Sequence, residues 1–253
     1  MIESKKIIKT TLILATLLIL TNIIPAQAES LIKLPDLTGA DSPSDYVSNI
    51  RLLILLTILT LLPSFIMMMT SFTRIIVTFS FLKGAIGVQQ GIPNQIFIGL
   101  ALFLTIFIMT PVYSEINREA LIPFMNEEIN QEVAIDRASA PIRKFMLEQT
   151  RDKDLQLFAD LSGVDEEELT MEKVPLHIVV PAFIISELKT AFQIGFLLYI
   201  PFLIIDLVVA SVLMSMGMFM LQPTIISLPF KLLLFVMVDG WNILVESIIK
   251  SFF

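Results

Sequence analysis

The sequence predicts an all-α membrane protein in which two hairpins of long apolar helices flank a small, polar helical insert. Of its 253 residues, 55% are hydrophobic, and a mean hydropathy of +0.83 is too high for a soluble domain with a single membrane anchor. The formal charge of −7 is unevenly spread, because residues 114–175 hold fifteen acidic and seven basic side chains. About four long apolar segments remain outside this stretch once a signal peptide is removed.

Residues 1–28 have the features of a cleavable secretory signal peptide. Three lysines precede an apolar stretch, and Ala26 and Ala28 are small residues spaced as at a signal-peptidase site before Glu29. Cleavage after Ala28 leaves the polar linker, residues 29–50, outside the cytoplasm. The alternative is that the stretch is retained as a first membrane helix.

The first apolar hairpin is expected over residues 51–113. Its first segment, residues 51–82, is longer than the roughly 20 residues that span a bilayer, and we expect Pro63 to kink it. Arg74 lies inside this segment, so a carbonyl or a carboxylate has to receive its charge. A glycine-rich turn follows, and its basic flanks place it in the cytoplasm. The second helix, residues 96–112, is expected to end at its proline.

The acidic insert, residues 114–176, is expected to lie in the periplasm, because the connections alternate across the membrane. Its apolar residues recur at helical spacing, which predicts two or three short helices. Pro141 suits the first position of a helix, and Gly163 suits a helix end. The acidic run at residues 165–168 is typical of a solvated turn.

The second apolar hairpin is expected over residues 177–253. It consists of helices at about 183–213 and 227–249, with Pro201 interrupting the first and Pro229 opening the second. The loop between them is rich in methionine and has no charge. Loops normally run over wet surface, so a loop of this composition is expected to be buried in an assembly.

Ionisable residues inside the apolar segments form the first set of candidate functional residues. A charge in hydrocarbon is costly, so each is expected to face protein, water or another charge. Glu187 and Lys189 point to nearly opposite sides of a helix, so each needs its own partner. They either lock helices and subunits together by charge-assisted hydrogen bonds or relay protons. The set comprises Arg74, Glu187, Lys189, Asp206, Lys231 and Asp239.

Residues of the uncharged loop form the second set. They are Met214, Met216, Met218, Phe219 and Met220. A run of methionines is usually core filler, because the thioether side chain is flexible and fits irregular gaps. The same adaptability suits a gasket that closes on itself and also seals around a passing chain, and composition leaves both roles open.

Several kinds of chemistry have no support in the sequence. The absence of cysteine excludes disulfides, thiol catalysis and cysteine metal sites. His177 is the single histidine and has no co-ligand for a metal. There is no glycine-rich phosphate loop, no nucleophile motif and no basic patch for nucleic acid. We therefore predict no cofactor, no metal and no nucleic-acid partner.

Long stretches of the chain resemble a known family. They are LLPSFIMMMTSFTRIIV, GVQQGIPNQ, IGLALFLTIFIMTPV, PAFIISELKTAFQIGF, PFLIIDLVVASVLM, GMFM and SLPFKLLLFVMVDGW. These closely resemble the FliP family of flagellar type III export-gate proteins, which is related to the SctR proteins of virulence secretion systems. The resemblance covers most of residues 51–241, whereas the linker and the acidic part of the insert match only loosely.

The resemblance implies a non-enzymatic function in the bacterial inner membrane, at the flagellar basal body. FliP-like proteins form a ring, by resemblance pentameric, that joins FliR and FliQ in a pore for unfolded flagellar proteins, with FlhB and FlhA associated. The buried charges are then expected to meet neighbouring subunits. Alternatives are a proton- or ion-coupled secondary transporter and the equivalent gate subunit of a virulence system. Residues 1–28 favour the flagellum, since the virulence relatives generally lack a signal peptide.

The resemblance also implies that the Met-rich loop is the gasket of the pore. Met218 and Met220 occupy the core of the matching motif, and Phe219 stands where relatives often have another methionine. Met214 and Met216 are adjacent to the motif and match less directly.

Overall fold

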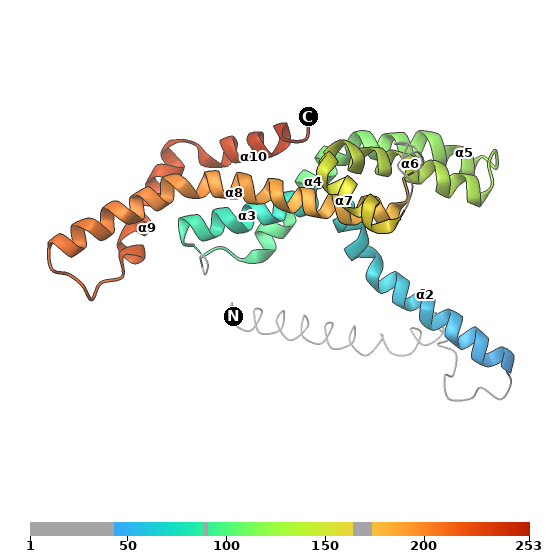
Figure 1. Ribbon diagram of the computed structural model, residues 1–253, viewed down its shortest axis with the longest axis horizontal. Coiled ribbons are helices and arrows are strands. Elements are labelled where there is room, and N and C mark those ends of the chain that lie inside the picture. Colours follow the sequence, from blue (N-terminus) through green and yellow to red (C-terminus); the bar gives the residue numbers. More distant parts are fainter. Residues whose placement is uncertain (1–42, 89–90, 164–173) are drawn as a thin grey trace, which may run out of the picture. The chain divides into compact units, whose positions relative to one another are not determined.

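The computed structural model describes residues 43–88, 91–163 and 174–253, and every regular element in these ranges is a helix (Figure 1). The expected signal peptide, its cleavage site at Ala26, Ala28 and Glu29, and the acidic run at 165–168 lie outside the described residues. The chain divides into two units, residues 1–61 and 62–253.

Helix α2, Pro43–Met68, starts inside the segment that was expected to be a linker. Beyond Arg51 it carries no charged residue, and its large apolar side chains from Leu53 to Leu62 are exposed. The hydroxyls of Thr57 and Thr60 donate to carbonyls one turn earlier, at 2.8 and 2.7 Å, so the helix presents little unsatisfied polarity. Pro63 lies inside the helix, which continues to Met68, and residues 69–71 separate it from α3.

The core of the second unit forms where α3, Phe72–Ile86, packs along α8, Leu176–Ser215. Phe79 from α3 and Phe183 from α8 are fully buried within it. The two helices approach closely at Gly195, where an added Cβ would lie 2.4 Å from Cγ of Phe81. Helix α4, Asn94–Ile116, packs on the other side of α3.

The sequence predicts that the helix ends at Pro111, but α4 continues past this residue. It continues to Ile116, then through a π-helical turn, η2 (Asn117–Leu121), into α5 (Ile122–Met125). A proline inside a helix removes one hydrogen bond and clashes with one carbonyl, which the surrounding turns can accommodate, particularly in apolar surroundings. Residues 94–125 therefore form one candidate membrane span.

The insert contains two further helices, α6 (Gln131–Gln149) and α7 (Asp152–Ser162). Pro141 is inside α6, so the expectation that it opens a helix is wrong. The start signal is instead Asn130, whose side chain accepts a hydrogen bond from the Val133 N–H at 2.9 Å. The predicted helix end at Gly163 is confirmed, because this glycine has φ = 68° in the left-handed region.

The last two helices also differ in detail from the expectation. Helix α8 is 40 residues long and continuous through Pro201, so Pro201 does not interrupt it. Helix α9, Pro223–Met237, starts at Pro223 and contains Pro229 in its interior. The chain then bends by 65° and continues as α10, Gly240–Lys250. Within the described ranges there are thus two candidate spans, 94–125 and 176–215, or three if α9 and α10 together form one.

Candidate functional site

Arg74 on α3 and Glu187 on α8 form an ion pair in the core of the second unit. The Arg74 Nε donates to Glu187 Oε2 at 3.0 Å, and Nη2 donates to Oε1. Their side chains are 3% and 0% exposed, respectively. This bidentate arrangement matches the planar guanidinium to the carboxylate and joins the two helices of the core.

Arg74 also holds the C-terminal residues and the insert against α3. Its Nη1 donates to the Ser251 carbonyl at 2.7 Å and to Ser251 Oγ at 2.9 Å, and its Nη2 donates to Gln149 Oε1 at 3.0 Å. The guanidinium carbon lies 3.8 Å from the centre of the Phe252 ring, which is a cation–π contact. One side chain therefore connects α3, α6, α8 and the end of the chain.

Asp206 and Lys231 form a second ion pair, between α8 and α9. The Lys231 Nζ donates to Asp206 Oδ2 at 2.6 Å and to the Ala85 carbonyl of α3 at 3.0 Å. Ser227, one turn before Lys231, donates its hydroxyl to the other oxygen of Asp206. The Asp206 side chain is 21% exposed, so this pair lies at the edge of the core.

Lys189 and Asp239 lie on the surface of the single chain. Within the described residues, Lys189 makes no ion pair or hydrogen bond through its side chain. Asp239 has φ = 51° at the bend between α9 and α10, and its carboxylate accepts one long bond from Asn242, at 3.3 Å. The six candidate charges therefore do not form one cluster: four make two pairs, and these two stay apart.

A polar contact outside the expected set joins the insert to α8. Ser186 accepts a hydrogen bond from the Arg151 N–H at 3.1 Å and donates to Asp154 Oδ2 at 2.6 Å, while the Arg151 guanidinium also donates to Asp154. Desolvation raises the pKa of Asp154, but the bonds from Ser186 and Arg151 and the charges of Arg151 and Lys189 outweigh it, so the pKa is lower than usual.

The Met-rich loop follows a well-defined helix end. Gly217 has φ = 74°, its N–H donates to the Met214 carbonyl at 3.0 Å, and the Met218 N–H donates to the Leu213 carbonyl at 2.9 Å. These two bonds define a Schellman motif, which needs glycine in the left-handed position. The direction in which the loop leaves α8 is therefore fixed by its backbone.

The side chains of the loop have no cover within the chain. Met214 lies in the last turn of α8 and the other four candidates follow it, and all five are exposed, with Phe219 at 78% and Met220 at 99%. A residue that fills a core is shielded by its own chain, so these side chains are not core filler in the single chain. Pro223 then starts α9 and turns the chain back along α8.

The arrangement is suited to holding helices together more than to acid–base chemistry. Both oxygens of Glu187 accept hydrogen bonds from Arg74 and neither is open to solvent. Both oxygens of Asp206 are likewise engaged. Among the residues that the structure describes, no group of three or more histidine or acidic side chains could hold a metal ion.

Several members of these clusters were not among the sequence candidates. Ser227 could have been found, because it lies four residues before Lys231 and so shares its helix face. Gln149, Ser251 and Phe252 carry no such signal, since they reach Arg74 from 75 or more positions away in the chain. The role of Ser186 depends equally on how the insert folds back onto α8.

An all-α fold with apolar spans, buried ion pairs and an uncovered apolar loop defines a membrane protein with helices locked by internal charges. A model of the FliP family matches residues 55–248. The chain therefore belongs to the FliP family, as the resemblance in its sequence had indicated.

Individual relatives agree with the family match. The chain is 53% identical over 214 residues to the flagellar biosynthetic protein FliP of Bacillus subtilis (strain 168), which covers 85% of this chain and 96% of that protein. It is 51% identical over 228 residues to the protein of the same name from Pectobacterium carotovorum subsp. carotovorum, covering 90% and 87% of the two chains. For Aquifex aeolicus (strain VF5) the identity is 51% over 207 residues, covering 81% and 87%.

Proposed function

We propose that this protein is a pore-forming subunit of the flagellar type III protein export gate. Copies of the chain assemble into a ring in the bacterial inner membrane, conduct unfolded flagellar proteins and carry out no bond chemistry. The proposal rests on the family and on one structural observation, the exposed side chains of Met214, Met216, Met218, Phe219 and Met220 at the end of α8 and in the loop before α9.

The loop is proposed to seal the pore when no substrate is passing. Thioether side chains are flexible and polarisable, so several copies of Met218 and Met220 can pack together at a ring axis and rearrange around a polypeptide. The Schellman motif at Gly217 holds the base of the loop while its tip stays adaptable. Phe219, with fewer rotatable bonds, stiffens the seal.

The assembly is proposed to involve a pentameric ring, with FliR and FliQ in the pore complex and FlhB and FlhA beside it. The apolar surface that α8 and α9 leave exposed is available for these contacts and for lipid. In the described part of the chain Lys189 and Asp239 form no ion pair, and they are proposed to meet charges on neighbouring subunits. In this topology the insert is periplasmic.

A proton- or ion-coupled transporter is the alternative from another functional class. A proton relay needs a carboxylate that can exchange its proton with water or a carrier. Both oxygens of Glu187 instead accept hydrogen bonds from Arg74. One oxygen of Asp206 accepts from Lys231 and the other from the Ser227 hydroxyl. This arrangement favours the export gate. The equivalent role in a virulence system has less support, because the relatives described above carry the flagellar name.

The gasket is tested by replacing Met218 and Met220 together with alanine in the full chain, expressed with its partner proteins. We expect assembled ring in normal yield and a large increase in the leak of small ions across the membrane. Met237→Ala is the matched control, because Met237 is exposed on α9 but outside the loop. An unchanged ion leak in the double variant would refute the gasket.

The transporter alternative is tested at Lys189. Lys189→Gln should reduce the yield of assembled ring if this lysine meets a neighbouring subunit. A normal yield of ring together with lost export would favour the relay.

A further inference from the structure

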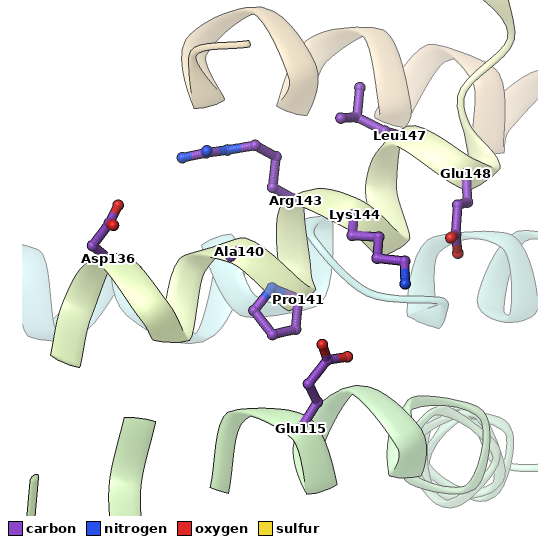
Figure 2. Close-up of a pocket in the computed structure, with 8 residues that line it drawn as sticks. All are labelled: Glu115, Asp136, Ala140, Pro141, Arg143, Lys144, Leu147 and Glu148. Carbon is purple, nitrogen blue, oxygen red and sulfur yellow. The ribbon is translucent and has the colours of Figure 1, made fainter. Parts of the chain in front are cut away.

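A cavity of about 610 Å³ lies between α4 and α6 (Figure 2), and α6 is at the opposite end of α8 from the Met-rich loop (Figure 1). Glu115 extends from α4 toward α6, while Lys144 and Glu148 project from α6 on the side that faces α4. Cavities of this size are typical of sites for small molecules. The cavity is separate from the two ion pairs of α8, and no role proposed above uses it.

A slot of about 180 Å³ continues the cavity along α4. It shares Glu115, Lys144 and Glu148 with the cavity, and its apolar walls include Ile108, Val112 and Phe253. Along α4 the surroundings therefore change from apolar to charged within about two turns. This is the profile that a phospholipid presents where its acyl chains meet its headgroup.

The position of the groove in the chain agrees with such a boundary. It lies in the second half of the candidate span 94–125, where the apolar run of α4 gives way to Ser114 and Glu115. Tyr113 is exposed at the same level, and aromatic side chains of this kind are enriched at membrane interfaces.

Lys144, Glu115 and Glu148 face one another across the groove without pairing. Lys144 and Glu148 are four residues apart on α6, a spacing that favours an ion pair. Nevertheless, in the described part of the chain Lys144 forms no salt bridge or hydrogen bond with Glu148 or with Glu115. Opposite charges around one cavity, held apart, leave donors and acceptors available for an occupant that carries both signs.

We propose that this groove binds a phospholipid whose zwitterionic headgroup carries a primary ammonium, as in phosphatidylethanolamine. Lys144 binds the phosphate, Glu115 and Glu148 accept hydrogen bonds from the ammonium, and one acyl chain lies in the slot against Ile108 and Phe253. Charge-assisted hydrogen bonds of this kind are roughly twice as strong as neutral ones. The proposal is independent of the export-gate function.

The balance of charge selects this headgroup among the common ones. Of the side chains assigned to the headgroup, Glu115 and Glu148 are acidic and Lys144 is basic, so an anionic headgroup such as phosphatidylglycerol meets net repulsion. The quaternary ammonium of phosphatidylcholine has no N–H to donate to the carboxylates. Phosphatidylethanolamine satisfies both sets of charges.

The test measures lipid binding to the purified full chain by native mass spectrometry, after exchange into detergent and addition of dihexanoyl lipids with each of the three headgroups. We expect the ethanolamine lipid to bind roughly tenfold more tightly than the choline lipid, the ratio that one charge-assisted hydrogen bond supports. Equal binding of the three, or preference for the glycerol lipid, would overturn the proposal. The proposal would also be overturned if none of the lipids bound because a second copy of the protein covers the groove.

Variants separate the roles of the groove residues. Glu115→Gln with Glu148→Gln should remove the preference for ethanolamine over choline while binding of both persists. Lys144→Gln should weaken binding of both lipids alike. Glu132→Gln is the matched control, because Glu132 is exposed on α6 but does not line the groove, and it should leave the preference unchanged. Loss of the preference in this control would contradict the assignment.

Discussion

The long helix α8 carries two acidic side chains that each meet a base, and the two pairs differ in how completely the chain encloses them. Glu187 is fully buried, and its partner Arg74 binds residues from α6 and from the C-terminal end of the chain. Asp206 is 21% exposed, and its partner Lys231 makes one further hydrogen bond, to the Ala85 carbonyl. The first pair lies beside the insert, and the second lies on the side of the Met-rich loop.

This difference indicates how the protein can be rigid at one end of α8 and adaptable at the other. Arginine offers five donors in a fixed plane, so Arg74 can fix four segments in one geometry. Lysine has a flexible stem and a single charged nitrogen, so Lys231 can follow small movements of α9 without losing Asp206. The second kind of contact suits the proposed gasket, which would open and close.

Breaking the enclosed pair should have the largest effect. Glu187→Gln leaves the Arg74 charge buried without a carboxylate, and Arg74→Met leaves the Glu187 charge buried without a base. Each change should lower the free energy of unfolding, measured by denaturant titration in detergent, by about 3–5 kcal/mol.

The double variant, Arg74→Met with Glu187→Leu, tests whether the unpaired charge is the cause. It removes both charges and should be less destabilised than either single variant, although Gln149 and Ser251 still lose a donor. Single variants that cost less than about 1 kcal/mol would show that the pair is not the anchor described here.

Breaking the partly exposed pair should cost less. Lys231→Met leaves Asp206 in contact with solvent and with the Ser227 hydroxyl, and the Ala85 carbonyl loses its donor. We expect a loss of about 2 kcal/mol in the same titration. Lys250→Met is the control, because the Lys250–Glu246 pair is fully on the surface and should contribute under about 1 kcal/mol. A cost equal to that of Arg74→Met would remove the distinction between the two pairs.

The packing between the two pairs can be tested without changing a charge. Gly195→Ala places a methyl group against the Phe81 ring, which has to move, and should cost about 1–3 kcal/mol. Gly99→Ala in α4 meets nothing within 4 Å and should be neutral or stabilising by up to about 1 kcal/mol. Equal results for the two glycines would show that α3 and α8 do not approach closely at this point.

Much of this organisation could be predicted from the sequence, because it depends on local pattern. Apolar runs identified the helices, Gly163 identified a helix end, and Arg74 in an apolar run indicated that a carboxylate or a carbonyl must lie near it. The prolines were the main source of error. Pro111, Pro141, Pro201 and Pro229 lie inside continuous helices, whereas breaks occur at residues 69–71 and at Asp239.

The partners of the candidate residues could not be predicted, because they depend on tertiary packing. Nothing local indicates that Arg74 pairs with Glu187, 113 positions away, or that Ser251 completes the cluster. The surface positions of Lys189 and Asp239 depend equally on which helix faces α3 covers. Burial is therefore decided by neighbouring helices that the local pattern does not identify.

The smallest expected effect concerns Asp154, which attaches the insert next to the enclosed pair. Because its pKa in the folded protein is below that of the unfolded chain, it stabilises the fold at neutral pH, and this contribution is lost as the pH falls below about 4 toward the folded pKa. Asp154→Asn should cost about 1 kcal/mol at pH 7. The difference from the unmodified protein should shrink at pH 3, when measured by denaturant titration at both values. Asp160→Asn, on the exposed side of α7, is the control and should leave the free energy of unfolding unchanged at both pH values. If Asp154→Asn costs the same at pH 7 and pH 3, the insert is attached through packing and not through this carboxylate.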